Sequence, residues 1–103
     1  MLTFLKNLFK PSVDIVKIVE AGAIVIDVRT PSEYNAGHID DSKNIPLDYI
    51  KKEIAAIKKL NKPVITVCRS GNRSGIAKSI LSSAGIEVYN GGALTILKKQ
   101  IQK

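Results

Sequence analysis

The spacing of apolar residues changes from one segment to the next, and it predicts which segments are strands and which are helices. Residues 23–29 and 64–67 are runs rich in Val and Ile, and residues 86–89 form a third apolar stretch. Runs of this kind are typical of strands buried on both faces of a parallel sheet. Residues 44–46 are expected to form at most a very short strand.

Helices are predicted between these strands, where apolar residues recur every three or four positions. Thr30, Pro31 and Glu33 form a capping-box sequence for a short helix that ends at Gly37. Asp48 is expected to cap the helix that follows. The apolar faces of the three longer patterns consist of Ile15, Val16, Ile18 and Val19, of Ile50, Ile54, Ile57 and Leu60, and of Ile76, Ala77, Ile80, Leu81 and Ala84.

Strands and helices alternate along the whole chain, and a turn at residues 90–92 precedes a final helix over residues 93–102. This alternation predicts an α/β fold with a mainly parallel central sheet flanked by helices. Ligands of such sheets bind beyond the carboxyl ends of the strands. Three of those ends fall at residues 27–29, 68–73 and 90–92, so we expect a site there.

One domain is expected to cover residues 12–103, preceded by an amphipathic N-terminal extension at residues 1–11. The extension is too short to span a membrane, and it lacks the basic start and the cleavage site of a signal peptide. It is expected to pack on the domain, to fray or to touch a lipid surface. We therefore expect no integral membrane segment, and we expect a monomer.

The composition is ordinary for a soluble globular domain, since 45% of the 103 residues are apolar and 24% are charged. The single cysteine, Cys68, excludes a disulfide within the chain and a cysteine-based zinc site. It suits a reducing compartment, so we expect a cytoplasmic protein without a metal or another cofactor.

The net charge of +7 is unevenly placed along the chain. Residues 54–103 hold nine lysines and arginines against Glu87 alone, whereas residues 1–53 are close to neutral. A positive field can draw anions to a site, although we assign most of the lysines to solvated helix surfaces. Nucleic-acid binding is not expected, because no recognition motif or cluster of exposed aromatic residues accompanies the charge.

Candidate chemistry centres on Cys68, which ends a predicted strand and opens a short loop of small and cationic residues. The loop consists of Arg69, Ser70, Gly71, Asn72, Arg73 and Ser74. Backbone N–H groups and a helix N-terminus favour negative charge there, and such a setting lowers a thiol pKa from ~8.5 to roughly 3.5–7.5. The alternative is an inert buried cysteine, which rarely opens a loop that carries glycine and arginine.

Three residues outside the loop are candidates for supporting roles. His38 can pair with a thiolate, or it can make a structural hydrogen bond in the turn after Gly37. Asp27 interrupts a buried strand and could act as a general base. A structural bond to Arg29 or to a loop N–H is favoured, because a buried carboxylate needs a partner.

These landmarks, in this order, resemble the rhodanese family of sulfurtransferases over nearly the whole chain from about residue 13. The matching segments are Ile26-Asp27-Val28-Arg29, Pro31-Ser32-Glu33-Tyr34, Gly37-His38-Ile39, Asn44-Ile45-Pro46, the loop from Cys68 to Ser74, and Asn90-Gly91-Gly92. The resemblance implies the rhodanese fold in its single-domain form.

The resemblance also implies a two-step sulfur transfer. Cys68 would take the outer sulfur of a small anionic donor such as thiosulfate, and cyanide or a thiol, including a protein thiol, would discharge the persulfide. Arg69 matches a position that binds the donor, Arg73 matches one that fixes the loop, and the N–H groups of residues 69–74 would surround the persulfide. Because the chain has no second cysteine, the acceptor is expected to come from outside it.

Two features depart from the family pattern. Asp41 and Ser42 stand where glycine and alanine are common before the Asn-Ile-Pro segment, which leaves the shape of that turn open. The chain also has no tryptophan, so Ile96 or a neighbour is expected to fill the core space that a tryptophan often occupies.

Two kinds of protein are alternatives to an active sulfurtransferase. A cysteine phosphatase or arsenate reductase needs arginine six positions after the cysteine, where this chain has Ser74, and Arg73 comes one position early. A non-catalytic rhodanese-like binding or sulfur-carrier module is the other alternative. Such modules often lose the cysteine, which this chain retains together with both arginines, so the sequence favours an enzyme.

Overall fold

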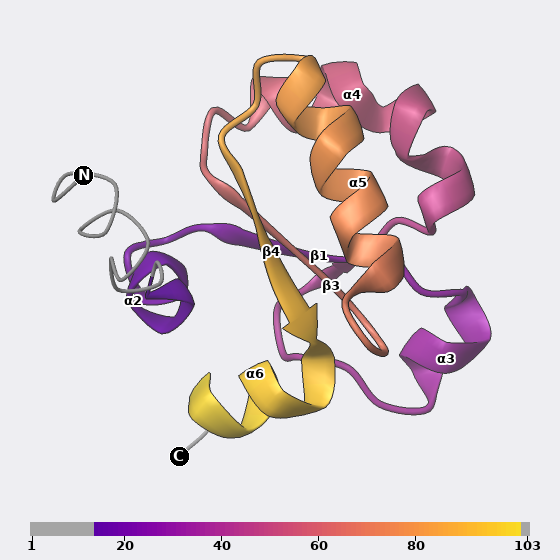
Figure 1. Cartoon of the computed structure of the whole chain (residues 1–103), viewed down its shortest axis with the longest axis vertical. Helices are drawn as coiled ribbons and strands as arrows, with labels where there is room; N and C mark the ends of the chain where they lie inside the picture. The colour runs from indigo at the N-terminus through magenta and orange to yellow at the C-terminus, as the bar shows by residue number, and fades with distance from the viewer. Residues whose placement is uncertain (1–13, 102–103) are drawn as a thin grey trace, which may run out of the picture.

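Four parallel strands in the order β2-β1-β3-β4 form the centre of the computed structural model, which describes residues 14–101 (Figure 1). The strands are β1 (Ile24–Asp27), β2 (Lys43–Asn44), β3 (Val64–Cys68) and β4 (Val88–Ala93). The two central strands pair from Ile24 with Val64 to Asp27 with Val67. The prediction of an α/β fold with a parallel sheet is therefore confirmed.

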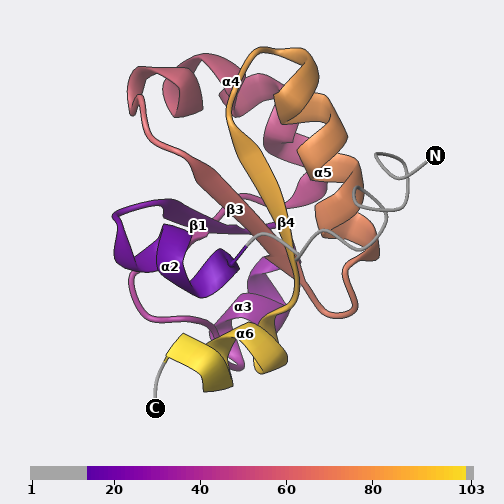
Figure 2. The ribbon, with the colours of Figure 1, turned by 60° about the vertical axis from the view of Figure 1, so that its left-hand side comes forward.

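Helices cover both faces of this sheet (Figures 1 and 2). They are α2 (Ile15–Glu20), α3 (Pro31–Asn35), the 3-10 helix η1 (Leu47–Tyr49), α4 (Ile50–Lys59), α5 (Asn72–Ser83) and α6 (Leu94–Ile101). Figure 1 shows α4 and α5 at the upper right of the strands and α2 and α6 at the lower left. The α3 helix follows the carboxyl end of β1 directly.

The sheet separates two apolar clusters, because successive residues of a strand point to opposite faces. The cluster beneath α4 and α5 includes Ile26, Val28, Ile50, Ile57, Val64, Cys68, Ala77 and Leu81. The cluster beneath α2 and α6 consists of Val25, Ile39, Ile65, Val67, Leu94 and Leu97. Cys68 thus lies on the side of the sheet that α5 covers.

Local sequence signals explain two of the helix starts. The Glu33 N–H donates to the Thr30 hydroxyl at 3.3 Å, and the Thr30 N–H donates to the Glu33 carboxylate at 3.1 Å. This capping box, with Pro31 in the first turn, is the one that the sequence predicts. Asp14 caps α2 by a single bond, in which its carboxylate accepts from the Lys17 N–H.

The prediction that Asp48 caps α4 is wrong. Asp48 lies within η1, and α4 begins after this 3-10 turn without a side-chain cap. The turn is closed by a 2.8 Å bond from the Tyr49 N–H to the Pro46 carbonyl, so the backbone itself leads into the helix.

The prediction of a turn at residues 90–92 is also wrong, because these residues belong to β4. Asn90 pairs with Thr66, and the register then shifts because Gly91 forms a β-bulge. A Cβ atom at Gly91 would lie only 2.7 Å from the Ile65 side chain. Glycine is needed here for the close approach of two strands rather than for a reversal of the chain.

Of Ile96 and its neighbours, which were expected to fill core space in this region, Leu97 is the one that lies in the core. Ile96 is 62% exposed, whereas Leu97 is 1% exposed and packs in the cluster beneath α6. The predicted extension at residues 1–11 lies outside the described residues. Among residues 14–101, none of the helices has the length and apolarity needed to cross a bilayer.

Candidate active site

Cys68 is the last residue of β3, and it is only 1% exposed. The Gly71 N–H donates to its Sγ atom at 3.0 Å, and the Ser74 N–H donates to it at 3.4 Å. The Ser74 side chain contacts the same atom, with 3.3 Å between Sγ and Oγ. Polar groups from one short loop therefore converge on one sulfur atom.

The loop curls around the sulfur because Gly71 has a left-handed backbone, with φ of 99°. The α5 helix begins at the next residue, Asn72, and Ser74 lies in its first turn. The partial positive charge of the helix N-terminus is thereby placed beside Cys68.

The surroundings of Cys68 act on its ionisation in opposite directions. Burial raises the pKa of the thiol, but hydrogen bonds from the Ser74 side chain and from the backbone of Ser74, Ser70 and Gly71 lower this pKa more. The pKa therefore lies below its ordinary value, which increases the thiolate fraction at neutral pH.

Arg73 joins the start of α5 to α3. Its Nη1 and Nη2 atoms donate to the two carboxylate oxygens of Glu33 at 2.7 and 3.0 Å. This bidentate pair lowers the pKa of Glu33 to about 2 and raises the pKa of Arg73. Arg73 is thus bound to a protein carboxylate and anchors the loop.

Arg69 has different surroundings from Arg73. It is exposed, as are its loop neighbours Ser70 and Asn72, and its side chain makes no hydrogen bond or ion pair with residues 14–101. Arg69 is therefore the loop cation that is open to a small anion.

Asp27 and Arg29 form a buried ion pair at the carboxyl end of β1. Arg29 Nη2 lies 2.8 Å from Asp27 Oδ2, and Nε lies 2.9 Å from Oδ1. Arg29 Nη2 also donates to the Gly37 carbonyl at 2.7 Å, and the Asn44 amide donates to the Asp27 and Arg29 carbonyls. The structure therefore places Asp27 against Arg29, where the pair braces the segment after β1.

His38 is bonded to α3 rather than to the cysteine loop. Its ring stacks on Tyr34 with 3.9 Å between the centroids, and Nδ1 lies 2.9 Å from the Tyr34 carbonyl oxygen. Because a carbonyl only accepts, Nδ1 carries the proton. Within the described part of the chain, no hydrogen bond joins His38 to Cys68, which favours the structural alternative for this residue.

Asn90 belongs to the site, although the sequence indicated only a turn at this position. Its Oδ1 atom accepts from the Ser74 hydroxyl at 2.7 Å and from the Gly92 N–H at 2.9 Å. Its Nδ2 atom donates to the Gly71 carbonyl at 3.1 Å. One sequence signal could have indicated that Asn90 is a site residue, namely its position before a Gly-Gly pair at the end of a strand.

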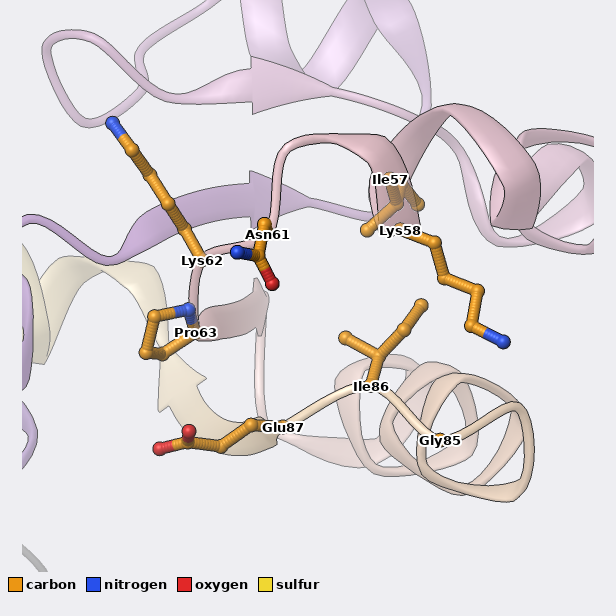
Figure 3. Close-up of a pocket in the computed structure, with 8 residues that line it drawn as sticks. All are labelled: Ile57, Lys58, Asn61, Lys62, Pro63, Gly85, Ile86 and Glu87. Carbon is orange, nitrogen blue, oxygen red and sulfur yellow. The ribbon is translucent and has the colours of Figure 1, made fainter.

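A cavity of about 280 Å³ lies at the other end of the strands (Figure 3). Its lining residues are Ile57, Lys58, Asn61, Lys62, Pro63, Gly85, Ile86 and Glu87, which precede β3 and β4, whereas Cys68 ends β3. Figure 3 shows the amino groups of Lys58 and Lys62 pointing in different directions, so they do not form a clamp. A smaller pocket of about 110 Å³, lined by Val28, Thr30, Pro46, Leu47, Asp48 and Arg73, lies beside the cysteine loop.

The arrangement around Cys68 is suited to a negatively charged sulfur atom. Two N–H groups and a hydroxyl contact Sγ, and Arg69 is open to an anionic reactant beside it. Such contacts stabilise a thiolate or a persulfide anion. Within residues 14–101, no group of three His, Cys, Asp or Glu side chains is placed to hold a metal ion.

Comparison with known proteins identifies the family. Residues 13–98 match the family model described as a rhodanese-like domain. The thiosulfate sulfurtransferase PspE of Escherichia coli K12 is 44% identical over 71 residues, which cover 67% of this chain and 68% of that protein. The thiosulfate sulfurtransferase GlpE of Pseudomonas fluorescens is 38% identical over 72 residues, covering 69% of this chain and 65% of that protein.

A solved structure gives the same result. The structure of a rhodanese with anions from E. coli has a TM-score of 0.66 and 41% identity, and the match covers 72% of this chain and 89% of that one. The matched segment spans about two thirds of the length of both named relatives. With its parallel sheet, its cysteine loop and these matches, the chain belongs to the rhodanese family.

Proposed function

We propose that this chain is a sulfurtransferase that moves a sulfane sulfur from an anionic donor such as thiosulfate to an external acceptor, through a persulfide on Cys68. The observation that carries the proposal is the convergence of the Gly71 N–H, the Ser74 N–H and the Ser74 hydroxyl on Sγ. The names of the two thiosulfate sulfurtransferases support the choice of donor.

In the first half-reaction, the Cys68 thiolate attacks the outer sulfur of thiosulfate. A bond forms between Sγ and that sulfur, the S–S bond of thiosulfate breaks, and sulfite leaves with the electron pair. The lowered pKa of Cys68 supplies the thiolate. Arg69 is exposed beside it and holds the anionic donor, while Arg73 keeps the loop in place through Glu33.

In the second half-reaction, cyanide or a thiolate attacks the outer sulfur of the persulfide. The bond between Sγ and the outer sulfur breaks, and its electron pair returns to Sγ as the thiolate. The same N–H groups stabilise this thiolate as the leaving group. Because Cys68 is the only cysteine, the acceptor is external, and protein thiols belong to this class.

The cytoplasm is the location that suits this chemistry. Oxidation of Cys68 would block both half-reactions, and the chain has no second thiol with which to reverse it. A reducing compartment keeps such a cysteine available.

The phosphatase or arsenate reductase alternative is disfavoured by Arg73. This residue comes five positions after Cys68, one short of the loop that encloses a tetrahedral oxyanion, and its guanidinium is bound to Glu33. Hydrolysis of p-nitrophenyl phosphate is a direct check. Turnover that depends on Cys68 would contradict the sulfurtransferase proposal.

The decisive experiment is mass spectrometry of the protein after exposure to thiosulfate. We expect one added sulfur atom on Cys68, which cyanide or dithiothreitol removes, and no adduct on the Cys68→Ser variant. An unmodified wild-type protein, or an equal adduct on Cys68→Ser, would defeat the mechanism. Thiocyanate formed over many turnovers with cyanide distinguishes an enzyme from a sulfur-carrier module, which would stop after one equivalent.

Replacement of Arg69 tests the binding of the anionic donor. We expect Arg69→Ala to reduce kcat/KM for thiosulfate by roughly tenfold, because one charge-assisted contact with the donor is lost. The rate of Cys68 alkylation by neutral iodoacetamide should hardly change. Lys78→Ala, an exposed cation on α5, is the control and should leave both rates unaltered. If Arg69→Ala lowered kcat/KM for thiosulfate and the rate of Cys68 alkylation by the same factor, Arg69 would only shape the loop.

A further inference from the structure

The Ser74 hydroxyl lies between two acceptors and can serve only one of them. Its Oγ atom is 2.7 Å from Asn90 Oδ1 and 3.3 Å from Cys68 Sγ. A serine hydroxyl has a single proton to donate. Donation to Asn90 therefore withholds that proton from the sulfur, and donation to the sulfur withholds it from Asn90.

Asn90 can only accept from Ser74, because its amide is held in one orientation. The Gly92 N–H donates to Oδ1 at 2.9 Å, and the Gly71 carbonyl accepts from Nδ2 at 3.1 Å. A flipped amide would face each of these groups with the wrong atom and lose both bonds. Gly75 packs against the same amide, since a Cβ atom there would lie 3.3 Å from Nδ2.

The protonation state of Cys68 decides which acceptor receives the hydroxyl proton. In the thiol, the S–H group donates to Ser74 Oγ and the Ser74 hydroxyl donates to Asn90 Oδ1, so the bonds form one chain. After the thiol proton has left to a base in the solvent, Sγ can only accept. A hydrogen bond to an anion is about twice as strong as one between neutral groups, so the hydroxyl turns to the sulfur.

We propose that Asn90 is a positioning residue that competes with Cys68 for the Ser74 hydroxyl, holding it while Cys68 is a thiol and releasing it when the thiolate forms. Ser74 keeps its own proton throughout and only changes the direction of donation. When the hydroxyl has turned to the sulfur, Asn90 Oδ1 keeps the Gly92 N–H as its remaining donor.

Because Asn90 competes with Sγ for the Ser74 hydroxyl, the loop stabilises the thiolate less than it otherwise would. The bond to Asn90 stabilises the thiol state and so offsets part of the effect of the N–H groups on Sγ. Since the intrinsic nucleophilicity of a sulfur falls as its thiolate becomes more stable, Asn90 keeps Cys68 more reactive as an anion. This catalytic consequence rests on the proposed function, whereas the hydroxyl switch itself concerns only the ionisation of the thiol.

Several charged groups surround the loop. They are Arg69 and Arg73 of the loop, Glu33 of α3, Asp27 at the end of β1, Arg29 after it, and Asp48 of η1. The ion pair of Arg73 and Glu33 lowers the pKa of Glu33 to about 2 and raises the pKa of Arg73, so this pair keeps its charges through the neutral range. His38 is bonded to the Tyr34 carbonyl, and at the start of β4 the Tyr89 hydroxyl donates to Glu87 at 2.5 Å.

A double-mutant cycle on the Cys68 pKa tests the competition. The pKa is measured from the pH dependence of iodoacetamide alkylation in the full chain, in Ser74→Ala, in Asn90→Ala and in the double variant. Asn90→Ala loses the bond to the Gly71 carbonyl in both backgrounds, but it removes the competition only where the Ser74 hydroxyl is present. We compare the change in the Cys68 pKa that Asn90→Ala causes in the wild-type and in the Ser74→Ala background. We expect this change to be more negative by roughly 0.5 to 1 unit in the wild-type background.

Equal pKa changes in the two backgrounds would show that Asn90 only clamps the loop, and they would overturn the proposal. Loss of sulfur transfer from thiosulfate with the expected coupling intact would refute the proposed function and leave the switch standing. The two proposals can therefore fail separately.

A measurement on the unmutated chain covers the case in which Asn90→Ala does not fold. The Gly92 amide proton should move downfield in NMR spectra as Cys68 ionises, because Oδ1 has then lost its other donor. Ser74→Ala retains the charge of the thiolate but lacks the hydroxyl, so its Gly92 signal should shift much less. Equal shifts in the two proteins would overturn the proposal.

Discussion

Arg69 and Arg73 lie in the same loop, but their side chains have different tasks. Arg73 makes two bonds to Glu33, a residue 40 positions away in the chain, whereas Arg69 is exposed without a partner among residues 14–101. The family resemblance predicts different roles for these two arginines, and their contacts in the fold differ accordingly. At the scale of single residues, the carboxylate of α3 binds Arg73 and leaves Arg69 open to the anionic donor that we propose.

The charge of Glu33 contributes stability that depends on pH. Its pKa is lowered from 4.5 to about 2 in the folded protein by the bond to Arg73, so the unfolded chain takes up the proton first as the pH falls. The contribution is therefore complete above pH 4.5 and is lost as the pH falls to 2. We expect Glu33→Gln to lower the free energy of unfolding by about 0.5–1 kcal/mol at pH 7, and hardly at all near pH 2, in urea titrations.

Glutamine is the right replacement because it retains the capping-box bond to the Thr30 N–H while it removes the charge. Glu53→Gln, an exposed change in α4, serves as the control and should show no such difference between pH 7 and pH 2. A loss for Glu33→Gln that is the same at both pH values would rule out the charge as its cause.

At the scale of an element, α6 shows how one step along a helix separates a core residue from a surface residue. Leu97 is 1% exposed and packs beneath the sheet, while Ile96 beside it is 62% exposed. Consecutive residues of a helix point about 100° apart, so only one of the two can face the core. The apolar residue type did not distinguish them, and the packing of α6 against β4 did.

This pair gives a test of the packing of α6. We expect Leu97→Ala to lower the free energy of unfolding by about 2–4 kcal/mol, because it leaves a cavity beneath the sheet. Ile96→Ala is the matched control, and it should change the stability by no more than about 0.5 kcal/mol. Similar losses for the two variants in urea unfolding would mean that α6 is not docked by its Leu97 face.

At the scale of the whole molecule, the net charge of +7 is concentrated in residues 54–103, the half of the chain that contains the cysteine loop. A net positive charge raises the encounter rate of a small anion with the protein. The same charge does not act on a neutral reagent. The reaction with thiosulfate should therefore respond to salt, and alkylation should not.

We expect kcat/KM for thiosulfate to fall by roughly threefold or more between 0.01 and 0.15 M NaCl, because the screening length shortens from roughly 30 to about 8 Å. Alkylation of Cys68 by iodoacetamide over the same range is the control. A rate with thiosulfate that does not change with salt would limit the role of charge to Arg69 itself.

Much of the fold and the centre of the site could be derived from the sequence, because both depend on short-range patterns. Continuous Val and Ile runs between helical segments determined the parallel α/β sheet. The end of one such run determined that Cys68 lies at the carboxyl edge, and Gly71 determined that the loop curls there. The capping box at Thr30 and Glu33 is equally local, since its partners are three residues apart.

Contacts between distant parts of the chain were decided only by the tertiary structure. The pairing of β4 with β3 placed Asn90 against Ser74, 16 residues earlier, and made a predicted turn into part of a strand. The position of α3 gave Arg73 its partner, and the docking of α6 chose Leu97 over Ile96. A local pattern records which groups a residue can offer, whereas the folded backbone determines which partner lies within the 3 Å or so that a hydrogen bond requires.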